Sequence, residues 1–230
     1  MSEQRLTFES VTLEPMDEWG HPVRNISFEL AAGDALGVSW PHASGYPSLA
    51  DAVAGVWPPS VGTIMICGED WQNCSADAAA QWRSRIGRIF AGTAWLSNLD
   101  VDENITLVQR HFTSRPHTEI VAEALDWMGR FGRSALPNQR PVQVSGHDRT
   151  LAQWVRALLG ERDVLILENP FADVSGAEAE RFIAAVADKR AAGCAVLWIM
   201  ESPDQLNKYS LSLTQSATVK EGVWEMETLG

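Results

Sequence analysis

The sequence predicts an α/β protein in which a parallel sheet is covered by helices on both faces. Residues 164–167 (VLIL) and 195–199 (AVLWI) are short, continuous apolar runs. Such runs are typical of parallel strands that are buried on both faces. Helical spacing over residues 176–192 separates the two runs, and Gly193 provides a glycine stop after this helix. Apolar strands that alternate with helices favour a doubly covered parallel sheet.

The remaining segments extend this pattern from the N-terminus. Alternating apolar and polar residues predict two half-buried strands at 6–13 and 25–30. Up to residue 90 strands and helices follow one another, with strands at 35–39, 63–67 and 86–90 and helices at 48–56 and 77–85. Two helical segments come next, at 102–112 and 117–131, without a clear strand. We therefore expect a helical insertion between the two halves of the sheet.

Composition limits the classes of function. The 230 residues carry a formal net charge of −12, which argues against a nucleic-acid partner because phosphate binding needs a basic surface. Three scattered cysteines and five histidines show no disulfide framework and no metal-ligand spacing, so we expect no metal site. The first residues lack the layout of a signal peptide, and no apolar run approaches the roughly 20 residues that span a bilayer. We expect a cytoplasmic protein that reaches a membrane only through a partner, without inserting into it.

Several motifs, by their order and spacing, resemble the ATP-binding cassette (ABC) ATPase family over nearly the whole chain. In family order they are the strand, loop and helix at 35–56, the turn ending in Gly68-Glu69-Asp70, VSGHD at 144–148, Arg156-Ala157-Leu158, and the strand with its following loop at 164–175. The resemblance implies a P-loop NTPase-like parallel sheet core with an N-terminal antiparallel β portion, in a single domain over residues 1–230. We expect the RecA-like core and β portion at 1–90 and 146–230, and an inserted helical subdomain at 91–145.

The predicted phosphate-binding loop departs from the family's Walker A pattern, G-x-x-x-x-G-K-[ST]. In that pattern backbone N–H groups and the lysine hold phosphates, and the hydroxyl binds magnesium. Only Gly45 matches among the aligned residues, which are Trp40, Pro41, His42, Ala43, Ser44, Gly45, Tyr46 and Pro47. Tyr46 removes the positive charge of the lysine, and Pro47 lacks both the hydroxyl and a backbone donor. Trp40 places an indole where the family has no side chain, so the resemblance implies a degenerate Walker A motif.

The family's other catalytic positions are also replaced. Glu168 and Asn169 stand at the Walker B aspartate and the catalytic glutamate. Glu168 keeps a carboxylate that could contact a metal, whereas Asn169 does not accept a proton from water near neutral pH. Ala91 replaces the Q-loop glutamine, and Glu201 replaces the switch histidine with a charge that repels a γ-phosphate. We expect a pseudo-ATPase with no catalytic residue and no cofactor bound by its own site.

The signature motif is the least changed, with Val144-Ser145-Gly146-His147-Asp148 where the family has LSGGQ. Ser145 and Gly146 stand at a predicted helix N-terminus, where a hydroxyl and free backbone donors can meet a phosphate. His147 adds bulk and Asp148 adds negative charge. Two interpretations stay open: a plain helix cap, or a contact to ATP and Mg held by the Walker A motif of a head-to-tail partner.

Two tryptophans, Trp19 and Trp95, suggest two further surfaces. The family's adenine-stacking aromatic falls near Glu14 and Pro15, and Trp19 is either its substitute or an exposed turn residue. Trp95 and Leu96 lie where the family docks its membrane subunit, and we expect them to be docking anchors because a buried aromatic commonly dominates interface energy. The alternative for both residues is packing inside the helical subdomain.

The resemblance implies a degenerate nucleotide-binding subunit of an ABC transporter that does not itself hydrolyse ATP. Such a subunit would form a heterodimer with an active ABC ATPase subunit and dock on a transmembrane permease subunit at the inner face of the cell membrane. The alternative is a non-transport scaffold or regulatory protein that retains the fold as a binding module. A neighbouring gene for an intact cassette ATPase, beside genes for membrane subunits, would favour the transporter.

Overall fold

The computed structural model describes residues 3–41, 45–92, 94–174, 176–209 and 211–227. Within these residues ten strands form one sheet in the order β5-β4-β1-β2-β10-β9-β3-β8-β7-β6. The strands are β1 (Gln4–Leu13), β2 (Val23–Ala31), β3 (Ala35–Ser39), β4 (Val61–Ile66), β5 (Glu69–Asp70), β6 (Ile86–Ile89), β7 (Val164–Glu168), β8 (Ala195–Met200), β9 (Gln215–Lys220) and β10 (Val223–Glu227). The helices are α1 (Leu49–Val53), α2 (Ala76–Ser84), α3 (Val101–Phe112), α4 (His117–Arg130), α5 (Gly146–Leu158), α6 (Ala177–Ala191) and α7 (Pro203–Lys208), with a 3-10 helix at Pro141–Gln143.

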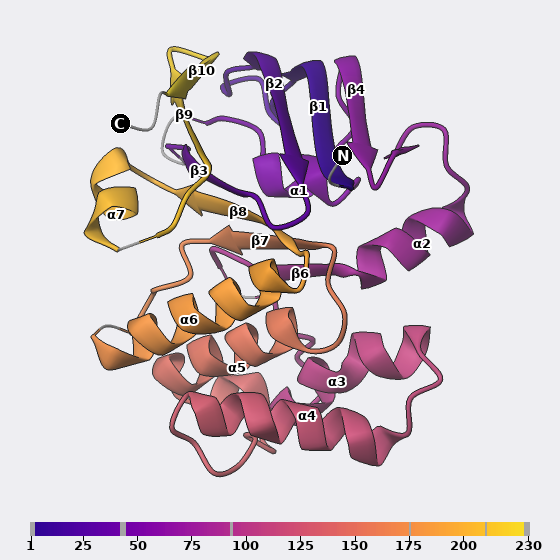
Figure 1. Ribbon diagram of the computed structural model, residues 1–230, viewed down its shortest axis with the longest axis vertical. Coiled ribbons are helices and arrows are strands. Elements are labelled where there is room, and N and C mark those ends of the chain that lie inside the picture. The colour runs from indigo at the N-terminus through magenta and orange to yellow at the C-terminus, as the bar shows by residue number, and fades with distance from the viewer. Residues whose placement is uncertain (1–2, 42–44, 93, 175, 210, 228–230) are drawn as a thin grey trace.

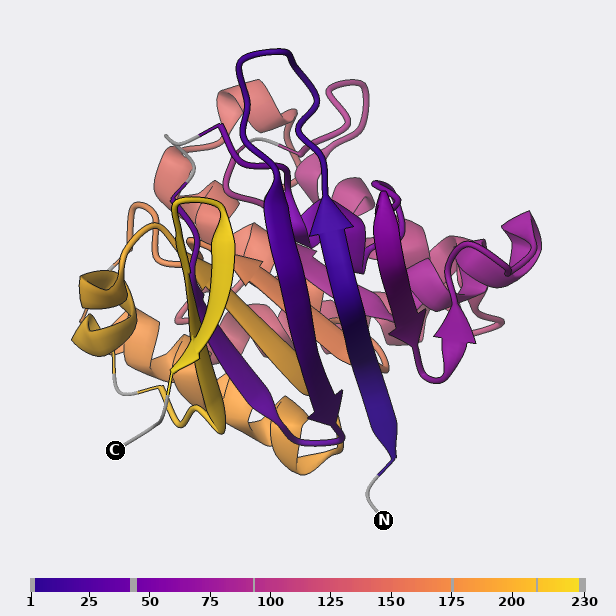
Figure 2. The same cartoon turned by 90° about the horizontal axis from the view of Figure 1, so that it is seen from above.

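The first part of the sheet is antiparallel, as expected. Strand β1 pairs with β2 on one side and with β4 on the other. Along β2 the buried residues Ile26, Phe28 and Leu30 alternate with exposed polar residues, which is the pattern of a strand with one face in the core. Figure 2 shows these strands in front of the parallel strands and the helices.

The second part of the sheet has its parallel strands buried on both faces. Strands β3, β8, β7 and β6 run parallel to one another. Leu165 and Leu167 of β7 face the helical side and belong to the core that includes α3 to α6. Val164 and Ile166 face the other side, where α1 and the antiparallel strands complete a second core. This two-sided burial explains the continuous apolar runs and confirms the predicted fold class (Figure 1).

The helices of residues 91–145 lie at the end of the molecule farthest from the antiparallel strands (Figure 1). They pack on α5 through aromatic side chains. The rings of Phe131 and Trp154 meet edge-on at 5.2 Å, and Trp154 stacks on Phe182 of α6 at 4.5 Å. The subdomain boundaries 91 and 145 stay a prediction. No helix in the described ranges is long and apolar enough to cross a membrane.

Some element boundaries differ from the sequence prediction. The helix expected at 48–56 is only Leu49–Val53, because Gly55 adopts a left-handed conformation with φ of 64° and ends it. A side chain at Gly55 would also collide with the ring of Trp71. The hairpin of β9 and β10 and the short helix α7 were outside the predicted elements. The buried residues of β9 include Ser216 and Thr218, so this strand lacks an apolar run.

Candidate functional site

Two aromatic side chains fill the loop that follows β3. Trp40 is 1% exposed, and its ring meets the ring of Tyr46 edge-on with centroids 6.1 Å apart. The Tyr46 Oη accepts a hydrogen bond of 3.0 Å from the backbone N–H of Gly222, in the turn between β9 and β10. The side chain of Tyr46 is therefore directed toward this hairpin and packs against the core. Ala43, also assigned to the degenerate Walker A motif, lies outside the described residues.

The start of α1 already carries its own cap. Pro47 is buried, and the Ser48 hydroxyl accepts a hydrogen bond of 3.1 Å from the backbone N–H of Asp51. Asp51 lies in the first turn, where its carboxylate interacts favourably with the helix dipole. Pro47, just before the cap, has no N–H to donate. This helix N-terminus therefore offers little to a phosphate.

The carboxylate predicted at the Walker B position is held by an arginine that sequence reasoning missed. Glu168 ends β7 and is buried, and Arg88 lies on the neighbouring strand β6. Arg88 Nε donates to Glu168 Oε2 at 2.8 Å, and Arg88 Nη1 lies 2.6 Å from Asp51 Oδ1. The guanidinium also lies over the ring of Phe90, 4.3 Å from its centroid. The signal in the sequence was a single arginine inside the otherwise apolar strand 86–90.

Four predicted positions meet at one small cavity. Ala91, Trp95, Gly146 and Asn169 all line a space of about 180 Å³ between β6, α5 and the end of β7. Asn169 has a positive φ of 44°, which asparagine tolerates better than most residues, and its N–H donates to Ile199 O at 3.0 Å. Glu201 does not line this cavity. Its side chain is exposed, and its N–H donates to the side chain of Gln205 at 2.9 Å.

The hydroxyl of Ser145 is engaged within its own helix. It accepts a 3.0 Å hydrogen bond from the Asp148 N–H and donates to Asp148 Oδ2 at 2.8 Å. The Ser145 hydrogen bond, together with the nearby charge of Arg133, lowers the pKa of Asp148. A second carboxylate, that of Asp173, lies so close that a Cβ added to Gly146 would meet it at 3.1 Å. Two carboxylates thus face the N-terminus of α5.

His147 belongs to the same polar cluster. Its Nε2 lies 2.7 Å from Glu178 Oε2, and its Nδ1 lies 3.0 Å from Arg133 Nη2. Because the arginine can only donate, Nδ1 accepts and Nε2 carries the proton toward Glu178. Arg133 Nε also donates to Asp148 at 3.2 Å. The predicted signature residues are therefore bound through side chains to α6 and to the loop before residue 140.

The two predicted aromatic surfaces differ in burial. Trp19 lies in the loop between β1 and β2 and is 88% exposed. In the same loop, the backbone N–H of His21 donates a hydrogen bond to Gly45 O at 3.2 Å. Trp95 is half-buried against the helical core, and the guanidinium of Arg156 lies 4.5 Å from its ring centroid. Leu96 is 49% exposed. Trp95 therefore combines packing with surface access, and Leu96 lies at the surface.

The described residues do not fit a nucleotide bound with magnesium at this loop. The loop from Trp40 to Pro47 has no lysine or arginine, and Tyr46 is directed to the β9–β10 turn. Arg88 occupies the carboxylates of Asp51 and Glu168. In the described part of the chain, no group of three or more His, Cys, Asp or Glu residues could hold a metal ion.

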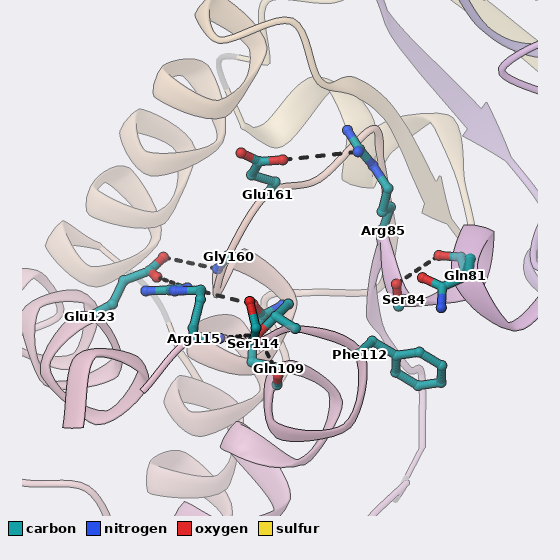
Figure 3. A pocket seen from close by; sticks show the side chains of 11 residues that line it. Gln81, Ser84, Arg85, Gln109, Phe112, Ser114, Arg115, Glu123, Gly160 and Glu161 are labelled. Atoms are coloured by element: carbon teal, nitrogen blue, oxygen red, sulfur yellow. Dashed lines mark hydrogen bonds and ion pairs between the residues drawn. The ribbon is translucent and has the colours of Figure 1, made fainter. Parts of the chain in front are cut away.

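A larger cavity of about 640 Å³ lies away from these residues, between α2, α3, α4 and the turn after α5 (Figure 3). Its charged side chains pair with one another. Arg115 lies 2.7 Å from Glu123, and Arg85 lies 3.9 Å from Glu161. Glu123 also accepts the Gly160 N–H at 2.9 Å, which joins α4 to the core. This cavity is therefore separate from the predicted nucleotide loop and has its charges satisfied.

Comparison with known proteins gives one consistent family. The family model described as "ABC transporter" matches residues 23–172. The methionine import ATP-binding protein MetN of Cupriavidus necator is 30% identical over 149 residues, which are 65% of this chain and 43% of MetN. The glutamate/aspartate import ATP-binding protein GltL of Escherichia coli is 29% identical over 163 residues, which are 70% of this chain and 67% of GltL. The match therefore spans less than half the length of that MetN.

Solved structures show the same fold. An ATP binding subunit of an ABC transporter superposes with a TM-score of 0.82 at 16% identity, over 98% of this chain and 90% of that chain. The ATP-binding cassette MJ0796, solved as a dimer bound to ADP and Pi, superposes with a TM-score of 0.81 at 17% identity, over 96% of this chain and 98% of that chain. At such identities the likeness concerns the fold alone.

Proposed function

Because the chain belongs to the ABC transporter family, we propose that it is a nucleotide-binding subunit of such a transporter whose own site neither binds ATP–magnesium tightly nor hydrolyses it. One observation carries this proposal most directly. Arg88 joins the carboxylates of Asp51 and Glu168, at 2.6 and 2.8 Å. A guanidinium stays protonated at any physiological pH, so it acts as a resident cation at the Walker B carboxylate. A metal ion would have to displace it from two carboxylates.

The proposal is supported by the other replaced positions. Tyr46 has no positive charge that could bind a phosphate, and Pro47 has no hydroxyl and no N–H. Asn169 is no general base near neutral pH. Ala91 and Glu201 lack the groups that the family uses beside the γ-phosphate. Because phosphoryl transfer depends on charge stabilisation and positioning together, the loss of all these groups argues against turnover.

We propose that the subunit works in a heterodimer with an intact ABC ATPase and docks on a transmembrane permease at the inner face of the membrane. The relatives named as import ATP-binding proteins and the cassette solved as a dimer support this assembly. In this arrangement Ser145 and Gly146, with His147 and Asp148 beside them, would face ATP and Mg held by the partner. Trp95 and Leu96 would lie at the permease.

A scaffold without a transport role is the second candidate. The observation that favours it is the state of the signature, because Asp148 holds the Ser145 hydroxyl and adds negative charge at the phosphate-facing end of α5. A signature used only as a helix cap would contribute nothing to a partner's ATP. The fold would then serve only as a binding surface.

Purification of the protein from native membranes, with identification of the co-purifying subunits, separates the two candidates. The transporter proposal expects an intact cassette ATPase and a permease in stoichiometric amounts. It also expects ATPase activity that is lost when the partner's catalytic glutamate is replaced. If the protein is recovered without a cassette ATPase and a permease, the scaffold is the candidate function that remains. ATPase activity of the purified single chain would overturn both candidates.

A further inference from the structure

The loop that follows β3 is bonded to two other loops of the chain. Two adjacent residues, Gly45 and Tyr46, form these links. Gly45 O accepts a hydrogen bond of 3.2 Å from the His21 N–H, in the loop between β1 and β2. Tyr46 Oη accepts one of 3.0 Å from the Gly222 N–H, in the turn between β9 and β10. Neighbouring residues of the predicted Walker A motif therefore hold two different parts of the sheet.

The two outer loops are also joined to each other. The Arg24 N–H, at the start of β2, donates to Gly222 O at 3.0 Å. A Cβ added to Gly222 would lie 2.6 Å from Pro22 O, so the two backbones are in close contact. Both backbone polar groups of Gly222 are thus used, the N–H toward Tyr46 and the carbonyl toward β2. The three loops form one connected group.

The contact between Gly20 and Gly45 leaves no space for a side chain at Gly20. A Cβ added to Gly20 would lie 2.6 Å from Gly45 O, and it would also collide with the side chain of Pro15. From the other side, a Cβ added to Gly45 would lie 3.2 Å from the Gly20 Cα. Gly45 also has a φ of 65°, which favours glycine. The β1–β2 loop and the loop after β3 therefore touch through their backbones.

Tyr46 supplies the side-chain part of this contact. Its ring packs on the core that contains the buried Trp40, with the two ring centroids 6.1 Å apart. Movement of the loop away from the β9–β10 turn would break the Tyr46 hydrogen bond and expose part of its ring to water. Both effects favour the closed arrangement. Lysine, which the family pattern has at this position, has no hydrogen-bond acceptor and could not receive the Gly222 N–H.

We propose that these loops form an internal clasp, made of Gly20, His21, Gly45, Tyr46 and Gly222, which holds the loop after β3 closed without any nucleotide. The inference deepens the proposed function, because it names the contact within the chain that fixes the conformation of the inactive site. Through the clasp, the loop after β3, the β1–β2 loop and the β9–β10 turn open and close as one unit. Loss of any one link therefore loosens the others.

Amide hydrogen exchange of the full chain, followed residue by residue by NMR without nucleotide, tests the clasp. Tyr46→Phe removes only the hydroxyl that accepts the Gly222 N–H. We expect exchange of the Gly222 and His21 amides to become about tenfold faster or more, although His21 bonds to Gly45 and not to Tyr46. Tyr209→Phe, at the chain's other tyrosine, is the control and should leave both rates unchanged. Equal rates in Tyr46→Phe and the wild type, or a change at Gly222 alone, would overturn the clasp.

A second variant opens the clasp from the opposite side. Gly20→Ala places a methyl group against Gly45 O, so we expect the His21 and Gly222 amides to lose protection, while the amides of β7 keep theirs. Gly129→Ala is the matched control, because a Cβ added there has no neighbour within 4 Å. Full protection of both amides in Gly20→Ala would contradict the inference. If Gly20→Ala does not fold, the Tyr46→Phe result decides alone.

Addition of ATP–magnesium to the wild type separates this inference from the proposed function. We expect micromolar ATP–magnesium to leave the exchange of the three loops unchanged. Slower exchange in these loops would show tight nucleotide binding and would overturn the proposed inactivity of the site. The comparison of the variants without nucleotide would still decide whether the clasp exists.

Discussion

The Nε atom of Arg88 lies 2.8 Å from Glu168 Oε2, so a guanidinium on β6 neutralises the carboxylate that ends β7. The parallel register of these strands pairs Ile89 with Leu167, which places the two polar residues close together. Asp51 from α1 completes the group at 2.6 Å. Three elements that surround the predicted nucleotide loop are thus joined by charges within the chain.

Removing Arg88 should therefore destabilise the protein. In Arg88→Met the Glu168 carboxylate stays buried without its partner, and we expect the free energy of unfolding to fall by about 3–5 kcal/mol. Urea unfolding followed by circular dichroism measures this change. The double variant Arg88→Met/Glu168→Gln should recover part of the loss, and Arg24→Met, at an exposed position, should stay within about 0.5 kcal/mol of the wild type. If the free energy of unfolding of Arg88→Met equals that of the wild type, the Arg88–Glu168 pair does not stabilise the fold.

Restoring the lysine of the Walker A motif should not restore activity. Tyr46→Lys adds a positive charge but removes the hydrogen bond from the Gly222 N–H. Pro47 would still lack the magnesium hydroxyl, and Asn169 would still be no base, and groups that act as a unit are strongly non-additive. Calorimetry with ATP–magnesium should detect no tight binding to the wild type, and phosphate release should stay at background in the variant. Family-like turnover after this single change would overturn the proposed inactivity.

The signature motif offers a test of its contribution to a partner's ATP. In the complex, Ser145→Arg should lower ATPase activity about tenfold or more without preventing assembly, because it blocks a donor site at the helix N-terminus. Asp148→Asn should raise the activity, since it removes a negative charge and weakens the hold on the Ser145 hydroxyl. Asp126→Asn, on the exposed face of α4, serves as the charge control. Unchanged rates in both signature variants would mean that the motif is only a helix cap.

Trp95 should matter for docking more than for folding. Trp95→Ala removes a half-buried ring, and we expect permease binding to weaken by about tenfold or more, as for an aromatic anchor. Trp19→Ala is the matched control, because its ring is 88% exposed in a different loop. Pull-down of the assembled complex measures binding, and circular dichroism checks the fold. Intact assembly with a folded Trp95→Ala protein would assign Trp95 to packing alone.

Because Cys194 is buried, we expect the folded protein to lose stability at alkaline pH. Burial raises the pKa of the Cys194 thiol from 9.0 to about 12. The pKa of this thiol is higher in the folded than in the unfolded protein. Its contribution to the free energy of unfolding is therefore fully present below pH 9.0 and is lost as the pH rises toward about 12. Denaturant unfolding across this window should show a steeper loss in the wild type than in Cys194→Ala. Cys74→Ala is the control at a half-buried cysteine, and equal slopes in all three proteins would contradict the assignment.

Much of the fold could be predicted from the sequence because its signals are local. The apolar runs of β7 and β8 report burial on both faces, which the structure confirms through the alternate placement of their side chains in two cores. The proposed losses of charge at Tyr46, of the hydroxyl at Pro47 and of the base at Asn169 are properties of single residues. These losses follow from side-chain chemistry once the sequence has been aligned with the family's motifs.

Only the tertiary structure decided which charges meet. Arg88 is 37 residues from Asp51 and 80 residues from Glu168, and no periodicity in the chain links these positions. Their pairing depends on the register of β6 against β7 and on the placement of α1. That Arg156 Nη2 is buried without a hydrogen-bond partner among the described residues is likewise known only from the structure. The sequence alone determined most of the elements and the chemistry available at each position. Packing decided which of the charged groups are neutralised, because electrostatic pairing depends on distance in space.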